Sequence, residues 1–142
     1  MTGGFINGIE SPGRAFDVAT GVTYSGSLIK LTTVEGQVDL NGAGERPDGY
    51  AMMPTRSRYP TVAVITTKKV TVLPLIPGTV VEIPVPATHA AITVGAEVET
   101  AASGCVILKD GAGEIVGKAM TALGQNVAGY IKVWVNPRTA SA

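Results

Sequence analysis

The chain has 142 residues, of which 15% are charged and 45% hydrophobic, and its 11 basic and 11 acidic residues cancel. A balanced charge gives no general attraction to nucleic acid or to an anionic membrane, and this hydrophobic content excludes a disordered chain. The length suits one domain with a core of its own. Eighteen glycines and nine prolines predict many short strands joined by tight turns, and hence a mostly β protein.

The chain begins with a glycine-rich segment. Residues 1–13 contain four glycines and a proline, so we expect an extended N-terminal arm, followed by a single β-rich domain over residues 14–142. The segment lacks the basic and apolar blocks of a signal peptide, and no window approaches the roughly 18 apolar residues of a membrane helix. These features predict a soluble protein that is made in a cytoplasm and has no membrane partner.

Strand patterns recur from residue 15 onward. Apolar and β-branched runs separated by Gly, Asn-Gly or Pro-Gly turns predict strands at residues 15–19, 27–32, 37–40, 49–53, 70–73, 79–85 and 130–137. Pro74, Pro84 and Pro86 predict strand ends or sheet edges, because proline cannot donate to a ladder. Residues 87–91 are expected to form one helical turn. No segment suits an amphipathic helix of three turns, so we expect a small barrel or sandwich.

The last predicted strand shows clear alternation. Ile131, Val133 and Val135 share one face, and Lys132 and Trp134 share the other.

Two stretches of the chain repeat one pattern of strand, glycine turn and strand. Residues 36–40 and 44–52 in the first copy correspond to residues 104–108 and 113–120 in the second. Such a repeat usually means two similar units that face each other across a pseudo-dyad and build one core. We therefore expect two pseudo-repeated β units.

The sequence offers little catalytic or metal-binding chemistry. Cys105 lies in a β-like run and is expected to be a buried, inert thiol, and the lone His89 lacks the clustered ligands of a zinc site. No Gly-x-Ser-x-Gly motif is present. Residues 111–117 are similar to a dinucleotide fingerprint, but the third glycine is one residue late, so a hairpin turn is expected. We expect no enzyme, metal or cofactor, although a Ser-Lys or carboxylate-pair enzyme stays open.

Charge is distributed unevenly along the chain. Residues 46–69 contain five basic residues and one acidic residue, whereas residues 70–108 contain three glutamates and no other charge. Complementary patches of this kind can set the register between copies or partners. The alternative is a solvated basic loop.

Two glycine turns carry a family resemblance. Residues 27–31 (Ser-Leu-Ile-Lys-Leu) are followed by residues 44–51 (Gly-Glu-Arg-Pro-Asp-Gly-Tyr-Ala), and a related turn occupies residues 112–119 (Ala-Gly-Glu-Ile-Val-Gly-Lys-Ala). This pattern resembles the small capsid cement, or decoration, proteins of tailed phages. The resemblance covers roughly residues 14–120, and its glycine-turn motifs are of modest specificity.

The resemblance implies a non-enzymatic virion protein on the capsid surface. Proteins of that family are β-rich, often trimeric, and bridge subunits of the major capsid protein. The implied partners are thus the major capsid protein and further copies of this chain in a homotrimer. The arm, with Phe5 and Ile6, and the loop with Arg56, Arg58 and Tyr59 are expected to contact capsid protein.

A different class of protein remains open from the same glycine pattern. A pseudo-twofold β unit is also typical of small ligand- or carbohydrate-binding β-barrel modules. A biotin or lipoyl carrier is disfavoured, because no Met-Lys-Met-like hairpin tip occurs near Lys109 or Lys118.

Overall fold

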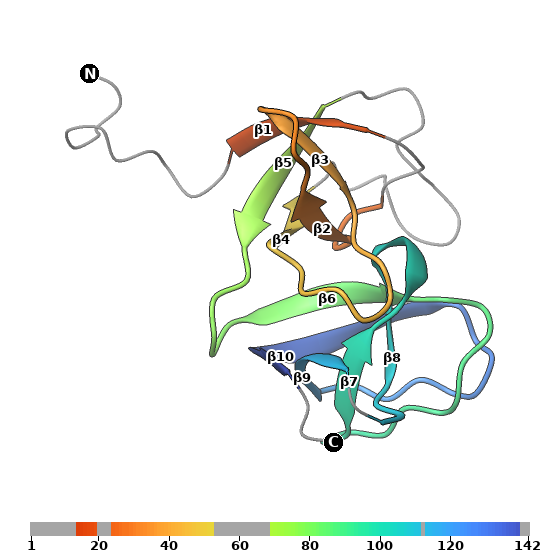
Figure 1. Cartoon of the computed structure of the whole chain (residues 1–142). Coiled ribbons are helices and arrows are strands. Elements are labelled where there is room, and N and C mark those ends of the chain that lie inside the picture. Colours follow the sequence, from red (N-terminus) through yellow and green to blue (C-terminus); the bar gives the residue numbers. More distant parts are fainter. Residues whose placement is uncertain (1–13, 20–23, 53–68, 112, 140–142) are drawn as a thin grey trace.

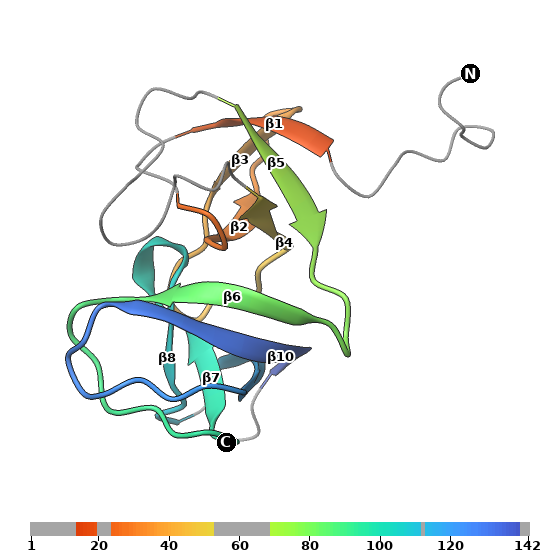
Figure 2. The ribbon, with the colours of Figure 1, turned by 180° about the vertical axis from the view of Figure 1, so that it is seen from behind.

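The computed structural model describes residues 14–19, 24–52, 69–111 and 113–139, which form ten β-strands in two stacked units (Figure 1; Figure 2). The strands of the first unit are β1 (Arg14–Val18), β2 (Leu28–Leu31), β3 (Gln37–Leu40), β4 (Gly49–Met52) and β5 (Lys69–Pro74). The strands of the second unit are β6 (Val80–Val85), β7 (Glu97–Thr100), β8 (Val106–Leu108), β9 (Glu114–Ala119) and β10 (Gly129–Thr139). The predicted mostly β fold is confirmed, whereas the predicted N-terminal arm lies outside the described residues.

One turn of 3-10 helix, η2 (Ala102–Gly104), lies between β7 and β8. The helical turn predicted at residues 87–91 is wrong, because this segment is a loop that is held to a second loop. The amide of His89 donates to the Asn126 side chain at 2.9 Å, in place of a hydrogen bond within a helix.

The first unit is a closed barrel, and the second is a curled sheet of the same design. The barrel has the strand order β1-β3-β2-β4-β5, with β1 parallel to β3 and antiparallel to β5. The second sheet has the order β6-β10-β9-β7-β8. If this curled sheet is read from β6 across its open seam to β8, the order becomes β6-β8-β7-β9-β10. This order matches that of the first barrel, because each strand of the second unit takes the place of the strand that lies five earlier in the chain.

The two units also share their strand register. Ile29 of β2 faces Gly49 of β4, and Val98 of β7 faces Gly117 of β9. Gly49 and Gly117 are also the positions that correspond in the repeat predicted from the sequence. The prediction of two repeated β units is therefore confirmed at the level of strand order and register.

The turns that enter β2 and β7 repeat as well. Gly26 has φ 88° and donates to the carbonyl oxygen of Ala51 at 2.8 Å, and Gly95 has φ 89° and donates to that of Ala119 at 2.7 Å. Positive φ at the third position of such a turn is readily adopted only by glycine. Each unit therefore uses one glycine to start the strand at its centre.

The second unit stays open between its edge strands β6 and β8, which approach within 8 Å between Cα atoms without pairing. In the first barrel this seam is closed by the amides of Asp17 and Ala19, which donate to carbonyl oxygens at the start of β3 at 2.9 and 2.8 Å. The register places Pro84 and Pro86 at the matching positions of the second unit. Proline has no amide hydrogen, so these two hydrogen bonds cannot form. The prediction of a sheet edge at these prolines is confirmed.

Each unit encloses its own hydrophobic core. The first core contains Ile29, Val38, Ala51, Val70 and Val72. The second contains Leu28, Val81, Ile83, Val85, Ile92, Val98, Val106, Val116, Ala119, Ile131, Val133 and Val135. The predicted single shared core is thus wrong, because each unit curls around its own interior. Leu28 links the two cores, since successive strand residues point to opposite faces, and it points out of its own barrel into the second unit.

The first unit meets both edges of the open side at glycines. A Cβ at Gly26 would lie 2.0 Å from the carbonyl oxygen of Glu82 in β6, and a Cβ at Gly104 would lie 2.8 Å from that of Leu28. The Gly104 amide also donates to the carbonyl oxygen of Asn41 at 2.8 Å. Gly104 ends η2 just before β8, so its contacts place the first unit against the β8 edge, as those of Gly26 place it against β6. Leu28, which is fully buried, lies between these two contacts.

A second pair of matched glycines permits close strand packing. A Cβ at Gly49 of β4 would lie 2.4 Å from the carbonyl oxygen of Leu73, and a Cβ at Gly117 of β9 would lie 1.9 Å from that of Trp134. No side chain fits at such distances, so glycine is required where β4 and β9 approach the next strand.

Replacing Leu28 with alanine is expected to lower the free energy of unfolding by about 2–5 kcal/mol, because the substitution leaves a cavity in the second core. Leu31→Ala is the matched control on the same strand, since Leu31 is 55% exposed. Its expected change is within about 0.5 kcal/mol. Urea unfolding followed by circular dichroism measures both values. Equal effects of the two substitutions would contradict the role of Leu28 as the link between the cores.

Gly117→Ala is expected to destabilise the protein by about 3 kcal/mol or to prevent folding, because backbone atoms must move to admit the methyl group. Gly124→Ala is the control, since the nearest atom to a Cβ there is the Val127 side chain at 3.6 Å. That change should stay below about 1 kcal/mol. Thermal unfolding compares the two variants, and a stable Gly117→Ala protein would contradict the close approach of β9 and β10.

Candidate functional site

The partner-binding residues proposed from the sequence are Phe5, Ile6, Arg56, Arg58 and Tyr59, and all five lie outside the described residues. Their contacts with a partner stay a prediction. The described strands and turns present a different candidate surface, on the outside of the second unit.

The two reactive side chains that the sequence singled out are both buried. The ring nitrogens of His89 lie 2.6 and 2.7 Å from the carbonyl oxygens of Ala90 and Val127, so the ring is held between two backbone groups of the fold. Cys105 is also buried, as predicted, and burial raises the pKa of its thiol to about 11. A protonated thiol is a poor nucleophile, so Cys105 is inert at neutral pH.

No group of three or more His, Cys, Asp or Glu side chains in the described part of the chain is arranged to hold a metal ion. Across the same residues, no helix combines the length and apolar character that crossing a membrane requires.

The outer face of β10 exposes a tryptophan. Ile131, Val133 and Val135 are buried, whereas Lys132 and Trp134 are exposed, which confirms the two faces predicted from the sequence. The Trp134 side chain is 54% exposed, although it stands on a strand that is paired on both sides. A large aromatic side chain held in water on a rigid strand is a candidate contact for a partner.

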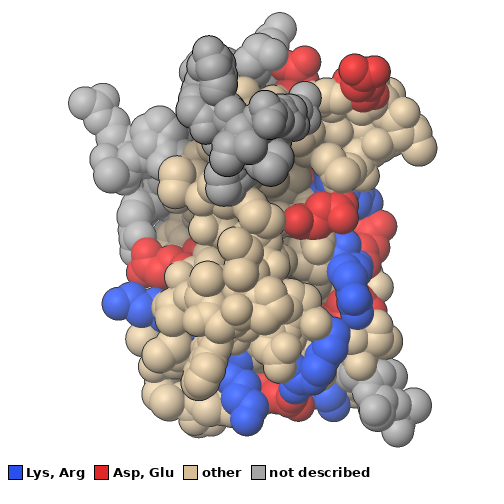
Figure 3. All heavy atoms as spheres, turned by 90° about the vertical axis from the view of Figure 1, so that its left-hand side faces the viewer, with Lys and Arg blue, Asp and Glu red and all other residues tan. Residues whose placement is uncertain are grey.

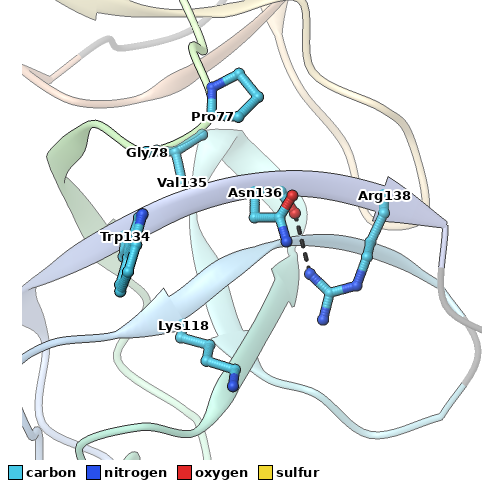
Figure 4. A pocket seen from close by; sticks show the side chains of 7 residues that line it. All are labelled: Pro77, Gly78, Lys118, Trp134, Val135, Asn136 and Arg138. Carbon is cyan, nitrogen blue, oxygen red and sulfur yellow. Dashed lines mark hydrogen bonds between the residues drawn. The ribbon is translucent and has the colours of Figure 1, made fainter.

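Trp134 stands beside a groove on this outer face. Across the sheet it faces Val80 of β6 on one side and Lys118 of β9 on the other. The groove has a volume of about 470 Å³. Its wall comes from the turn before β6 and from outward positions of β9 and β10, and it includes Pro77, Gly78, Lys118, Trp134, Asn136 and Arg138 (Figure 4).

The shape of the groove depends on an irregularity of β10 opposite Gly117. The register between β10 and β9 shifts between Val135 and Arg138. A bulge of this kind re-aims the side chains that follow it, here those of Asn136 and Arg138. Arg138 is then held by an ion pair with Glu97 and by a 3.1 Å hydrogen bond to the carbonyl oxygen of Asn136 (Figure 4). One end of the groove is thereby fixed.

The charge around Trp134 is locally positive. Lys132 stands opposite Glu82, and Arg138 is paired with Glu97. Lys118, beside the indole, has no ion pair with any of the described acidic residues. Figure 3 shows basic side chains, with acidic ones among them, on the lower part of this face, next to a broad uncharged area.

The turn motif that carries the family resemblance joins the two units. Arg46 donates to Glu114 of β9 at 2.6 Å and to Thr139 of β10 at 2.9 Å, and Thr139 donates to Glu114 at 2.6 Å. The hydrogen bonds from Thr139 and Arg46 lower the pKa of Glu114. In the same motif, Asp48 accepts the amide of Leu31 at 2.8 Å. The motif therefore serves the architecture of the protein.

The sequence placed Trp134 with Lys132 on one face of the last strand but did not identify it as a site residue. The available signal was a large aromatic residue at a polar position of an alternating strand. Lys118 and Asn136 carried no such signal, because their place beside the indole depends on the register and bulge of β10.

No protein-family model matches the sequence, and no curated protein matches it. Among solved structures, the chain is similar to the base of a phage head fibre, the gp8.5 N base of bacteriophage phi29. The TM-score is 0.59 at 11% sequence identity, and the match covers 85% of this chain and 92% of that chain. At this identity the similarity is one of fold, and it extends over nearly the whole of the phage domain.

Acidification is expected to weaken the joint between the two units. Because the folded protein lowers the pKa of Glu114, the stability from its carboxylate is fully present above the ordinary value of 4.5 and is lost as the pH falls through the lowered pKa. Glu114→Gln should therefore lose less stability than the wild type between about pH 7 and pH 3. Urea unfolding across this range measures the difference, with the exposed Glu35→Gln as control. An unchanged pH dependence in Glu114→Gln would contradict the network.

Proposed function

We propose that this protein is a non-enzymatic structural protein of a tailed-phage virion that binds the outer surface of the assembled capsid and bridges subunits of the major capsid protein. The similarity in fold to the base of the phi29 head fibre, over 92% of that domain, is the observation that carries the proposal. The glycine-turn resemblance to capsid cement proteins is separate support, since it comes from the sequence.

The architecture suits a protein that bridges neighbouring subunits. The two β units, joined by a buried side chain, backbone hydrogen bonds and the Arg46–Glu114 pair, keep their outer faces in one relative orientation. A homotrimer of such subunits would present several weak contacts at once, and linked contacts raise avidity without strong individual sites. Phe5, Ile6, Arg56, Arg58 and Tyr59 are proposed to add contacts outside the described residues.

The second candidate function is a small ligand- or carbohydrate-binding module, which the groove beside Trp134 favours. Apolar side chains fill the described interiors of both units, so a ligand would have to bind on the outer face. Capsid binding distinguishes the two functions, because a decoration protein saturates capsids at a fixed ratio to the major capsid protein and a ligand-binding module need not.

Purified protein is expected to co-sediment with mature capsids of the source phage, to saturate at a fixed ratio to the major capsid protein, and to raise the temperature at which capsids disrupt. Capsids of an unrelated phage serve as the control. Absence of binding to expanded source capsids, by a sample shown to be folded, would rule out this function and leave the ligand-binding module as the next candidate.

A further inference from the structure

We propose that the outer face of β10 around Trp134 is a docking surface for a protein segment that presents an apolar side chain flanked by carboxylates. This inference rests on the proposed function, under which the segment belongs to the major capsid protein. We define the Trp134 face by Val80, Lys118, Met120 and Trp134.

The fold itself does not require a tryptophan at this position. The register that pairs Gly117 with Val135 in the second unit pairs Gly49 with Pro74 in the first, so Leu73 is the counterpart of Trp134. The first unit closes into a barrel with a leucine there. The exposed indole of Trp134 is therefore not needed to form this kind of unit, since the first unit folds with a leucine at the same position.

Apolar side chains continue from the indole across neighbouring strands. Val80, directly opposite on β6, is 51% exposed, and Met120, just beyond β9, is 46% exposed. The Met120 amide donates to the carbonyl oxygen of Lys132 at 2.7 Å, so Met120 lies opposite Lys132 and diagonally across from Trp134. Exposed apolar side chains grouped on one sheet face and rimmed by charged side chains are typical of a protein–protein contact.

The indole is preorganised for binding. The backbone of Trp134 lies between the buried Val133 and Val135, on a strand paired with both β6 and β9. Little backbone freedom remains to be lost when a partner docks, which favours affinity. Tryptophan also leads the residues whose truncation most weakens protein interfaces.

Charge selects an acidic partner. Lys118 faces Trp134 on one side of the ladder and Glu97 on the other, but among the described residues the Glu97 carboxylate forms its ion pair with Arg138 and not with Lys118. A carboxylate next to an apolar anchor would complement Lys118 while the anchor packs on the indole.

The test is co-sedimentation of the full-length protein with mature source capsids. Trp134→Ala and Lys118→Glu are each expected to weaken capsid binding by about tenfold or more. The effect of Lys118→Glu should shrink as salt is added, because the pair is exposed. Leu31→Ala is the matched control, since Leu31 is as exposed as Trp134 but lies on the first unit. Circular dichroism and the melting temperature verify that each variant is folded.

The outcomes separate this inference from the proposed function. Wild-type binding together with unimpaired binding of Trp134→Ala and Lys118→Glu would overturn the docking surface and leave the capsid function standing. Absence of wild-type binding would overturn both. Loss of binding that accompanies loss of self-association, measured by light scattering after gel filtration, would overturn the capsid assignment of this face and identify its occupant as a second copy of the chain.

Discussion

The burial of Leu28 in the open side of the second unit is the contact on which the rest of the structure depends. Pro84 and Pro86 remove the hydrogen bonds that would close that unit, and a neighbouring barrel fills the resulting seam. Gly26 and Gly104 allow the two backbones to approach closely enough for this. Two copies of one architecture thus become different in role, because the closed copy completes the open one.

The sequence predicted the local features of this fold well. Alternation and turn residues located most strands, and the repeat anticipated the matched strand orders. The choice between barrel and sandwich stayed open, because closure depends on the parallel pairing of β1 with β3, which no local pattern encodes. That Pro84 cannot donate an amide hydrogen bond is evident from the sequence. That β6 and β8 are the strands left unpaired follows only from the three-dimensional register.

The candidate site was less predictable than the fold. Alternation placed Trp134 on the strand face opposite the apolar residues, but the groove beside it depends on Gly117, on a bulge in β10 and on a turn from a distant part of the chain. The Arg46 motif supported a family resemblance, and in the structure it ties the units together. Sequence motifs of modest specificity can thus mark joints of a fold as readily as partner contacts.

The order of the two units along the chain has a consequence for synthesis. Domains tend to form as the chain leaves the ribosome, with the N-terminal part first. Here the N-terminal unit is the one whose ladder closes on itself, and the C-terminal unit is the one with the gap. Leu28 is therefore made before the strands that need it, so the nascent second unit finds its missing wall within the same molecule. The reverse order would leave an apolar slot exposed while translation continued, when a neighbouring chain could enter it.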